Sequence, residues 1–225
     1  MVWSHTIVPG QDGGKLTERN SNAIKVALQP RRYVSETPNL TVVLASTRPG
    51  RKGEPIARWF VELARAHGGF DVKLVDLAEV NLPIYNEPQQ PVTGEYAYEH
   101  TRRWSNIVKS ADAFVFVMPE YNYSFNAAIK NALDYLYREW RYKPVGLVAY
   151  GGGANGTRSI QALKPVLLAL KLFWAGDVAI GLGAHPIVEG AFEGSELLEK
   201  AAHAMLGELA RLESALKVLR PEQTS

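Results

Sequence analysis

The sequence has no cysteine, few histidines and no long apolar run. The absence of cysteine among 225 residues excludes disulfides, thiolate nucleophiles, iron–sulfur clusters and cysteine-ligated zinc. The five histidines are scattered without a metal-ligand spacing, so we predict no metal site. Any redox chemistry therefore has to be carried by a bound organic cofactor.

Charge of one sign is also missing. Lys and Arg number 25 against 23 Asp and Glu, a net charge of +2, which argues against a nucleic-acid partner. No apolar run approaches the roughly 20 residues of a membrane helix, so no membrane partner is expected. The first residues lack the basic and apolar regions of a secretory signal. We therefore expect a cytoplasmic protein.

Turn-forming residues dominate the first part of the chain, and regular apolar segments follow. We expect a mobile N-terminal extension at 1–38, one domain at 39–220 and a short tail at 221–225. Short β-rich runs predict five strands, at 40–45, 70–75, 113–118, 145–150 and 178–182. Helical spacing of apolar residues predicts five helices, at 54–67, 95–110, 125–136, 160–170 and 197–216.

The strands are apolar throughout, without the alternation of a half-exposed sheet. Strands of this kind are typical of parallel sheets that are covered on both faces. The sequence therefore predicts an α/β fold, a doubly wound five-stranded parallel sheet with helices on both faces. The flavodoxin-like order 2-1-3-4-5 and half a Rossmann fold both fit this pattern.

Residues 46–54 follow the first strand and precede its helix. Backbone N–H groups and the helix dipole favour an anion at such a place. Ser46 and Thr47 add hydroxyl donors, and Arg48 and Arg51 add charged donors suited to phosphate oxygens. Gly50 and Gly53 allow the backbone to curl around an anion. The loop predicts a phosphomonoester site, and a solvated basic turn is the simpler alternative.

Two more loops follow later strands. Residues 118–124 contain two tyrosines and several amides, which suit a flat aromatic ring, although an ordinary turn has the same composition. At a topological switch point this loop would face the phosphate loop across one crevice, and FMN has both a phosphate end and an aromatic end. Residues 151–156 match G-x-G-x-x-G, but they follow the fourth strand, so a dinucleotide fingerprint is disfavoured.

These segments together resemble the NADPH-dependent FMN reductase family, flavodoxin-like oxidoreductases that include quinone and azo-dye reductases. The resemblance covers about residues 40–217. It is carried by the segments ASTRPGRKG (45–53), LPIYNEP (82–88), MPEYNYS (118–124), KNALD (130–134), KPV (143–145) and the glycines at 151–153. Ala45 and the pair Phe125–Asn126 depart from the common family pattern.

The resemblance implies a set of FMN-binding residues in three groups. The phosphate would be held by Ser46, Thr47, Arg48 and Arg51, with Gly53, Glu54, Pro55 and Ile56 at the start of the helix. The ribityl chain and ring would be lined by Pro119, Glu120, Tyr121, Asn122, Tyr123 and Ser124. The far edge of the ring would meet Gly151, Gly152 and Gly153.

The expected activity is hydride transfer from NADPH (or NADH) as co-substrate, through bound FMN, to a quinone, a flavin or a similar small-molecule acceptor. The cofactor carries this chemistry, so no catalytic side chain is assigned. A flavodoxin-type electron carrier that binds FMN without NAD(P)H turnover is the alternative.

The aromatic segment 134–144 predicts an assembly contact. Aromatic and arginine side chains are favoured in interface cores, although local packing would explain them too. The family resemblance also implies dimers. We therefore expect a homodimer or tetramer in which a helix running from Ser124 brings Trp140 to a subunit contact.

Overall fold

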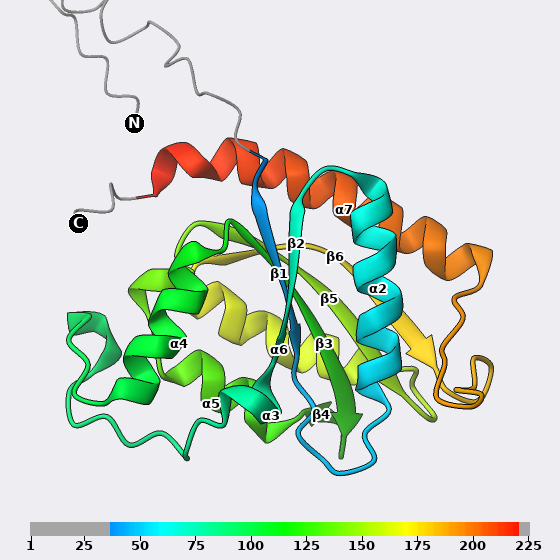
Figure 1. Cartoon of the computed structure of the whole chain (residues 1–225), viewed down its shortest axis with the longest axis horizontal. Coiled ribbons are helices and arrows are strands. Elements are labelled where there is room, and N and C mark those ends of the chain that lie inside the picture. Colours follow the sequence, from blue (N-terminus) through cyan, green and yellow to red (C-terminus); the bar gives the residue numbers. More distant parts are fainter. Residues whose placement is uncertain (1–36, 221–225) are drawn as a thin grey trace, which may run out of the picture. The chain divides into compact units, whose positions relative to one another are not determined.

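The computed structural model describes residues 37–220 (Figure 1). The expected extension, apart from residues 37 and 38, and the expected tail at 221–225 lie outside the described residues.

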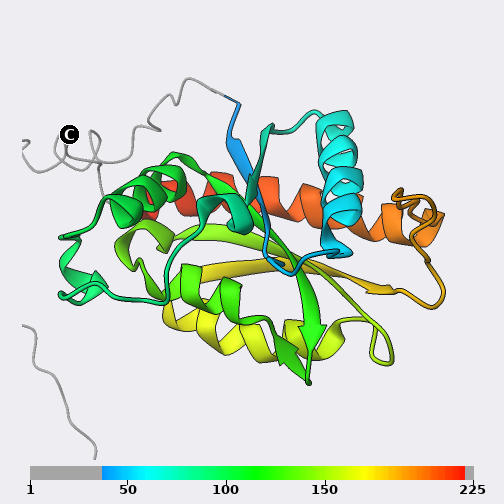
Figure 2. The same cartoon turned by 60° about the horizontal axis from the view of Figure 1, so that its bottom comes forward.

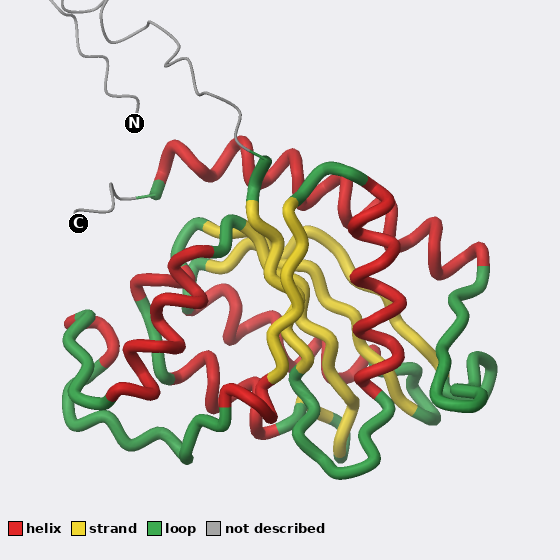
Figure 3. The backbone as a smooth tube through the Cα atoms, viewed as in Figure 1, coloured by secondary structure: helices red, strands yellow, loops and turns green. Residues whose placement is uncertain are grey.

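Five parallel strands form the centre of the domain, in the order β2-β1-β3-β5-β6 (Figure 3). Their bounds are β1 Asn39–Leu44, β2 Asp71–Asp76, β3 Ala113–Tyr121, β5 Lys143–Gly151 and β6 Leu172–Gly181. This order confirms the flavodoxin-like fold and excludes half a Rossmann fold. A two-residue strand, β4 (Ser124–Phe125), pairs antiparallel with the end of β3 and was not expected from the sequence.

The fifth strand begins earlier in the chain than the expected range 178–182. β6 begins at Leu172 and continues past Gly176, where a register shift at Val145 and Gly146 of β5 absorbs the irregularity. Because β6 is an edge strand, Phe173 and Trp174 at its beginning are partly exposed. The neighbouring interior strand β5, in contrast, is buried along its whole length.

Helices cover both faces of the sheet (Figure 2). One face packs against α2 (Gly53–His67) and α7 (Glu196–Leu216), and Phe60 and Leu206 are fully buried there. The other face packs against α4 (Glu99–Ser110), α5 (Ala127–Asp134) and α6 (Thr157–Ala169). The remaining helical turns are short: α3 (Leu77–Val80), η1 (Pro91–Thr93), η2 (Arg138–Trp140) and η3 (Lys217–Leu219).

The prediction that Trp140 lies at a subunit contact is wrong. Trp140 is fully buried inside the domain, with its ring centroid 5.1 Å from that of Phe114 and 5.9 Å from that of Trp104. Its indole N–H donates to the Leu133 carbonyl at 3.2 Å. Because α5 ends at Asp134, the following residues form an irregular segment with η2 and pack beneath the sheet instead of extending the helix.

Candidate functional site

The carboxyl ends of β1, β3 and β5 meet at the point where the strand order reverses, which is where open α/β sheets bind ligands. A cavity of about 170 Å³ lies there. All three loops named by the sequence contribute to its lining, which consists of Arg48, Lys52, Pro119, Glu120, Tyr121, Tyr150, Gly151, Gly152 and Leu182. The structure therefore brings the three predicted segments together at one cavity.

The loop at 45–52 offers unused hydrogen-bond donors. Among the described residues, the backbone N–H groups of Thr47, Arg48 and Lys52 make no hydrogen bond. The Arg48 guanidinium contacts only the Gly50 carbonyl, at 3.4 Å, and forms no ion pair with a described residue. Ser46 is fully buried, and its hydroxyl lies 3.3 Å from that of Tyr121. These free donors at the start of α2 fit an anion.

Arg51 is occupied by a carboxylate that sequence reasoning missed. Its guanidinium forms a two-pronged ion pair with Asp76 at the end of β2 and donates to the Ser46 carbonyl at 3.0 Å. Both side chains of the ion pair are largely buried. Arg51 thus holds the loop through contacts within the protein. Its direct contact with a phosphate stays a prediction. An Asp at the end of the neighbouring strand was the available signal.

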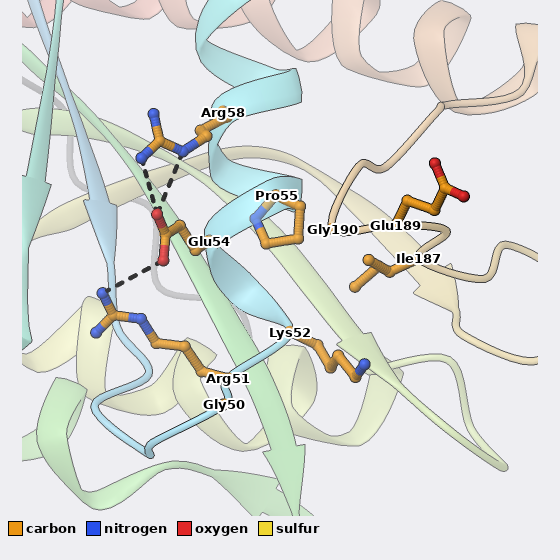
Figure 4. Close-up of a pocket in the computed structure, with 9 residues that line it drawn as sticks. All are labelled: Gly50, Arg51, Lys52, Glu54, Pro55, Arg58, Ile187, Glu189 and Gly190. Atoms are coloured by element: carbon orange, nitrogen blue, oxygen red, sulfur yellow. Dashed lines mark hydrogen bonds and ion pairs between the residues drawn. The ribbon is translucent and has the colours of Figure 1, made fainter.

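The residues at the start of α2 divide between two environments. Gly53 and Ile56 are buried, and the Ile56 side chain packs in the core. Glu54 and Pro55 line a second cavity, of about 510 Å³, which Ile187, Glu189 and Gly190 close on the opposite side (Figure 4). Neither of them lines the cavity at the strand ends.

Glu54 lies between two arginines (Figure 4). Its carboxylate is 2.8 Å from the Arg58 guanidinium and 4.0 Å from that of Arg51. The hydrogen bond from Arg58 lowers the pKa of Glu54, with the positive charge of Arg58 and then that of Arg51 acting in the same direction. The side chain of Glu54 is therefore directed to other protein groups and not to the crevice.

The tyrosine-rich loop is a hairpin turn. Asn122 and Tyr123 join β3 to β4 with φ values of 48° and 68°, the left-handed conformation that the centre of a tight hairpin requires. This conformation is uncommon for a residue as bulky as tyrosine. Tyr123 is 72% exposed, and the Arg158 guanidinium carbon lies 3.8 Å from its ring centroid. The hairpin thus presents exposed aromatic surface beside the cavity.

Glu120 joins the hairpin to the glycine loop. Its carboxylate accepts from the backbone N–H of Arg158 at 3.1 Å and from the Arg158 guanidinium at 3.3 Å, at the beginning of α6. The side chain of Glu120 is 9% exposed, so this negative charge is neutralised by the helix terminus and the arginine. Glu120 positions the two loops relative to each other. Pro119 is buried and Ser124 half-buried beside it.

The glycine loop leaves open space beside the cavity. A side chain at Gly152 or Gly153 would meet nothing within 4 Å, and among the described residues their N–H groups make no hydrogen bond. Gly151 is buried at the end of β5. The strict requirement for glycine falls instead on Gly156, where φ is 85° and a Cβ atom would lie 2.6 Å from backbone atoms of Ala149 and Tyr150.

Sequence reasoning missed three residues that line the cavity: Lys52, Tyr150 and Leu182. Lys52 was visible in the phosphate loop, and Tyr150 immediately precedes the glycines. Leu182 comes from the end of the edge strand, and its N–H donates to the Gly151 carbonyl at 3.0 Å. Only the packing of β6 beside β5 brings it to the site.

The donors of the cavity fit the phosphate end of FMN. Arg48 and Lys52 supply positive charge, and the one carboxylate in the lining, that of Glu120, is already paired with Arg158. The Tyr150 hydroxyl is buried and makes no hydrogen bond among residues 37–220. Over the same range there is no group of three residues that could ligate a metal ion. None of the helices described there could cross a membrane.

The strand order and the crevice at β1, β3 and β5 define a flavodoxin-like α/β protein. The model of the NADPH-dependent FMN reductase family matches residues 38–185, and the chain belongs to this family. The resemblance inferred from the sequence motifs is thereby confirmed. So is the predicted class of enzyme, an NAD(P)H-dependent oxidoreductase of the FMN and quinone reductase type.

Individual relatives agree with the family. The chain is 38% identical over 185 residues to an NAD(P)H-dependent FMN reductase of Schizosaccharomyces pombe, covering 81% of this chain and 90% of that protein. It is 32% identical over 158 residues to an NADPH azoreductase of a Bacillus strain, covering 68% and 83%. The flavoenzyme FerB of Paracoccus denitrificans shares the fold, with a TM-score of 0.58 and 21% identity over 80% of this chain and 98% of that one.

Proposed function

We propose that this chain binds FMN across the loops at 45–53, 119–124 and 151–153 and reduces a quinone or a flavin with NAD(P)H. One observation carries the proposal: N–H groups without a hydrogen bond to a described residue, and Arg48 without an ion pair to one, lie on the same cavity as the aromatic hairpin, at the switch point of the sheet. When bound, FMN supplies the centre that accepts a hydride and passes electrons to the acceptor.

At the phosphate end, the protein binds and orients. Arg48 and the N–H groups of the loop donate to the phosphate oxygens, as preorganised donors at a helix start do. Arg51 does not need to move, because its contacts with Asp76 and the Ser46 carbonyl hold the loop in shape. This arrangement costs little reorganisation when the cofactor binds.

At the ring end, the protein supplies aromatic surface and backbone donors. Tyr121 lines the cavity, and the Tyr123–Arg158 stack holds the tip of the hairpin. The free N–H groups of Gly152 and Gly153 can hydrogen-bond the polar edge of a ring, and the absence of side chains there lets the ring approach. No side chain is assigned to proton transfer.

We also propose that the protein assembles as a homodimer or tetramer and acts in the cytoplasm. Support for assembly comes from the segment between α3 and α4, which presents large apolar side chains to the surface: Ile84 is 89% exposed, Val92 49% and Tyr98 42%. The side chains of Asn131 and Tyr135 both donate to the Pro83 carbonyl, and these hydrogen bonds fix the backbone next to Ile84. Light scattering of the parent and of Ile84→Ser tests the assembly, and a parent that is a monomer at micromolar concentration would contradict it.

Turnover with a panel of acceptors tests the proposed function. The full chain, loaded with FMN, is mixed with NADPH or NADH and a quinone, free flavin or azo dye, and oxidation of the nicotinamide is followed. We expect acceptor-dependent turnover. A protein that binds FMN but shows no turnover with any acceptor would support the electron-carrier alternative, and a protein that binds no FMN would refute the proposal.

A further inference from the structure

A buried hydroxyl group without a partner lies beneath the phosphate loop. Tyr150 is 4% exposed and is the second-last residue of β5. Its hydroxyl makes no hydrogen bond among the described residues, although buried polar groups are normally paired. Phenylalanine has the same ring and would bury the same apolar surface in the strand without the hydroxyl. The hydroxyl group therefore points to a partner outside the protein chain.

The position of this hydroxyl singles out the start of α2. A Cβ atom added to Gly53, the first residue of the helix, would lie 2.6 Å from the Tyr150 oxygen. The tyrosine also lines the cavity at the strand ends, together with Arg48 and Lys52. An unpaired donor, two cations and free N–H groups thus meet at one helix N-terminus.

The hydroxyl is neutral at physiological pH and can therefore donate a hydrogen bond. Burial raises the pKa of Tyr150 far above its ordinary value, while the neighbouring Ser46 hydroxyl, and then the positive charges of Arg48 and Arg51, act in the opposite direction. The proton therefore stays on the oxygen. A neutral O–H near cations is suited to an acceptor that carries negative charge, such as a phosphate oxygen.

We propose that the Tyr150 hydroxyl donates a hydrogen bond to the phosphate of the bound flavin and makes the site select FMN over riboflavin. This inference rests on the proposed function, since it assumes that the loop at 45–53 holds the flavin phosphate. In it, the hydroxyl gains its missing partner only when a phosphate is bound.

Tyr135 provides a matched control. It too is buried, but its hydroxyl is paired, 2.9 Å from the Asn86 side-chain oxygen and 3.1 Å from the Pro83 carbonyl. The change from tyrosine to phenylalanine removes the same atom at both positions. At position 135 it breaks hydrogen bonds within the protein, whereas at position 150 it breaks none among residues 37–220.

The test measures binding of FMN and of riboflavin, by quenching of flavin fluorescence, and thermal unfolding of the flavin-free full chain. For Tyr150→Phe we expect FMN to bind about tenfold or more weakly and riboflavin to bind as in the parent. The flavin-free variant should melt at the parent temperature or above it, because an unpaired hydroxyl has been removed. Tyr135→Phe should show the reverse: lower thermal stability and unchanged binding of both flavins.

Two results would overturn the inference. If the parent binds FMN and Tyr150→Phe leaves the ratio of FMN to riboflavin affinity unchanged, this role of Tyr150 is refuted and the proposed function stands. If the parent binds neither flavin, the proposed function fails and this inference fails with it.

Discussion

Arg51 and Asp76 form a two-pronged ion pair that ties the phosphate loop to the end of β2. One of its hydrogen bonds, from Nη1 to Oδ1, measures 3.0 Å, and the same carboxylate also accepts from the Ala78 N–H at the start of α3. The ion pair therefore connects three pieces of the site scaffold: the loop after β1, the end of β2 and α3. Its role is to hold the shape of the loop.

Removal of the Asp76 charge tests this role. Asp76→Asn removes the anion that Arg51 pairs with in a largely buried place and leaves it only the more distant Glu54 carboxylate, at 4.0 Å, so we expect the free energy of unfolding to fall by about 2–3 kcal/mol. Urea denaturation measures the change. Arg58→Gln is the control, because the exposed Arg58–Glu54 ion pair should contribute less than about 0.5 kcal/mol. Equal losses in the two variants would show that Arg51 does not brace the loop.

Arg48 should affect cofactor binding without affecting stability. The side chain is exposed and forms no ion pair with a described residue, so Arg48→Ala should change the free energy of unfolding by less than about 0.5 kcal/mol. Loss of a charged hydrogen bond to the phosphate should weaken FMN binding by roughly 10- to 150-fold. Titration with FMN and with riboflavin checks the prediction. An equal loss of affinity for both flavins would place Arg48 away from the phosphate.

Lys143 should make stability depend on pH. Burial, and then the charge of Arg220, lowers the pKa of its amine to about 7 in the folded chain. The amine donates to the Val108 carbonyl at 2.7 Å and does not need its charge to do so. In the unfolded chain the amine keeps its proton up to about pH 10. Unfolding therefore takes up a proton between these values, and stability rises with pH in this window.

The slope should approach about 1.4 kcal/mol per pH unit between pH 8 and 9.5 for this one group. Below pH 7 the amine is protonated in both states, and the contribution ends. Urea denaturation at a series of pH values should show the rise in the parent and a flatter profile in Lys143→Met. Parallel profiles for the two proteins would mean that the amine remains charged in the folded chain.

Trp140 should contribute to the stability of the folded domain through its packing in the core. Its ring is fully buried against Trp104, Phe114 and Phe116, so Trp140→Ala should lower the free energy of unfolding by about 3–5 kcal/mol. Trp140→Phe should cost less, because it leaves a smaller cavity. Light scattering of Trp140→Phe should give the same mass as the parent. A change of mass with unaltered stability would restore the interface role that the structure denies it.

The fold could be predicted because its signals are local. The apolar runs at 40–45, 113–118 and 145–150 lie in β1, β3 and β5 or extend one residue past a strand end, since buried parallel strands need no alternation. The strand at 172–181 was harder, because Gly176 and Asp177 interrupt its apolar pattern and only pairing with β5 carries it through.

The limits of the sequence appear where a role depends on a distant partner. Arg48 and Arg51 cannot be told apart in the sequence of the loop. Only the folded position of Asp76 shows that Arg51 forms an ion pair within the protein, whereas Arg48 forms none with a described residue. The aromatic and charged neighbours of Trp140 in the sequence predicted an interface residue. Because α5 ends at Asp134, the chain instead places Trp140 in the core. In the sequence, Tyr150 is one more residue of a predicted strand. Only the structure shows that its buried hydroxyl has no hydrogen bond among the described residues and lies beneath the phosphate loop.

Anaerobic reduction of the flavin-loaded protein tests the central claim most directly. The full chain is saturated with FMN, freed of unbound cofactor and titrated with NADPH while its visible absorption is recorded. The account predicts that the flavin absorption persists through the removal of free cofactor, bleaches with NADPH and returns when a quinone is added. Loss of the flavin on removal of free cofactor, or retained flavin that NADPH does not bleach, would contradict it.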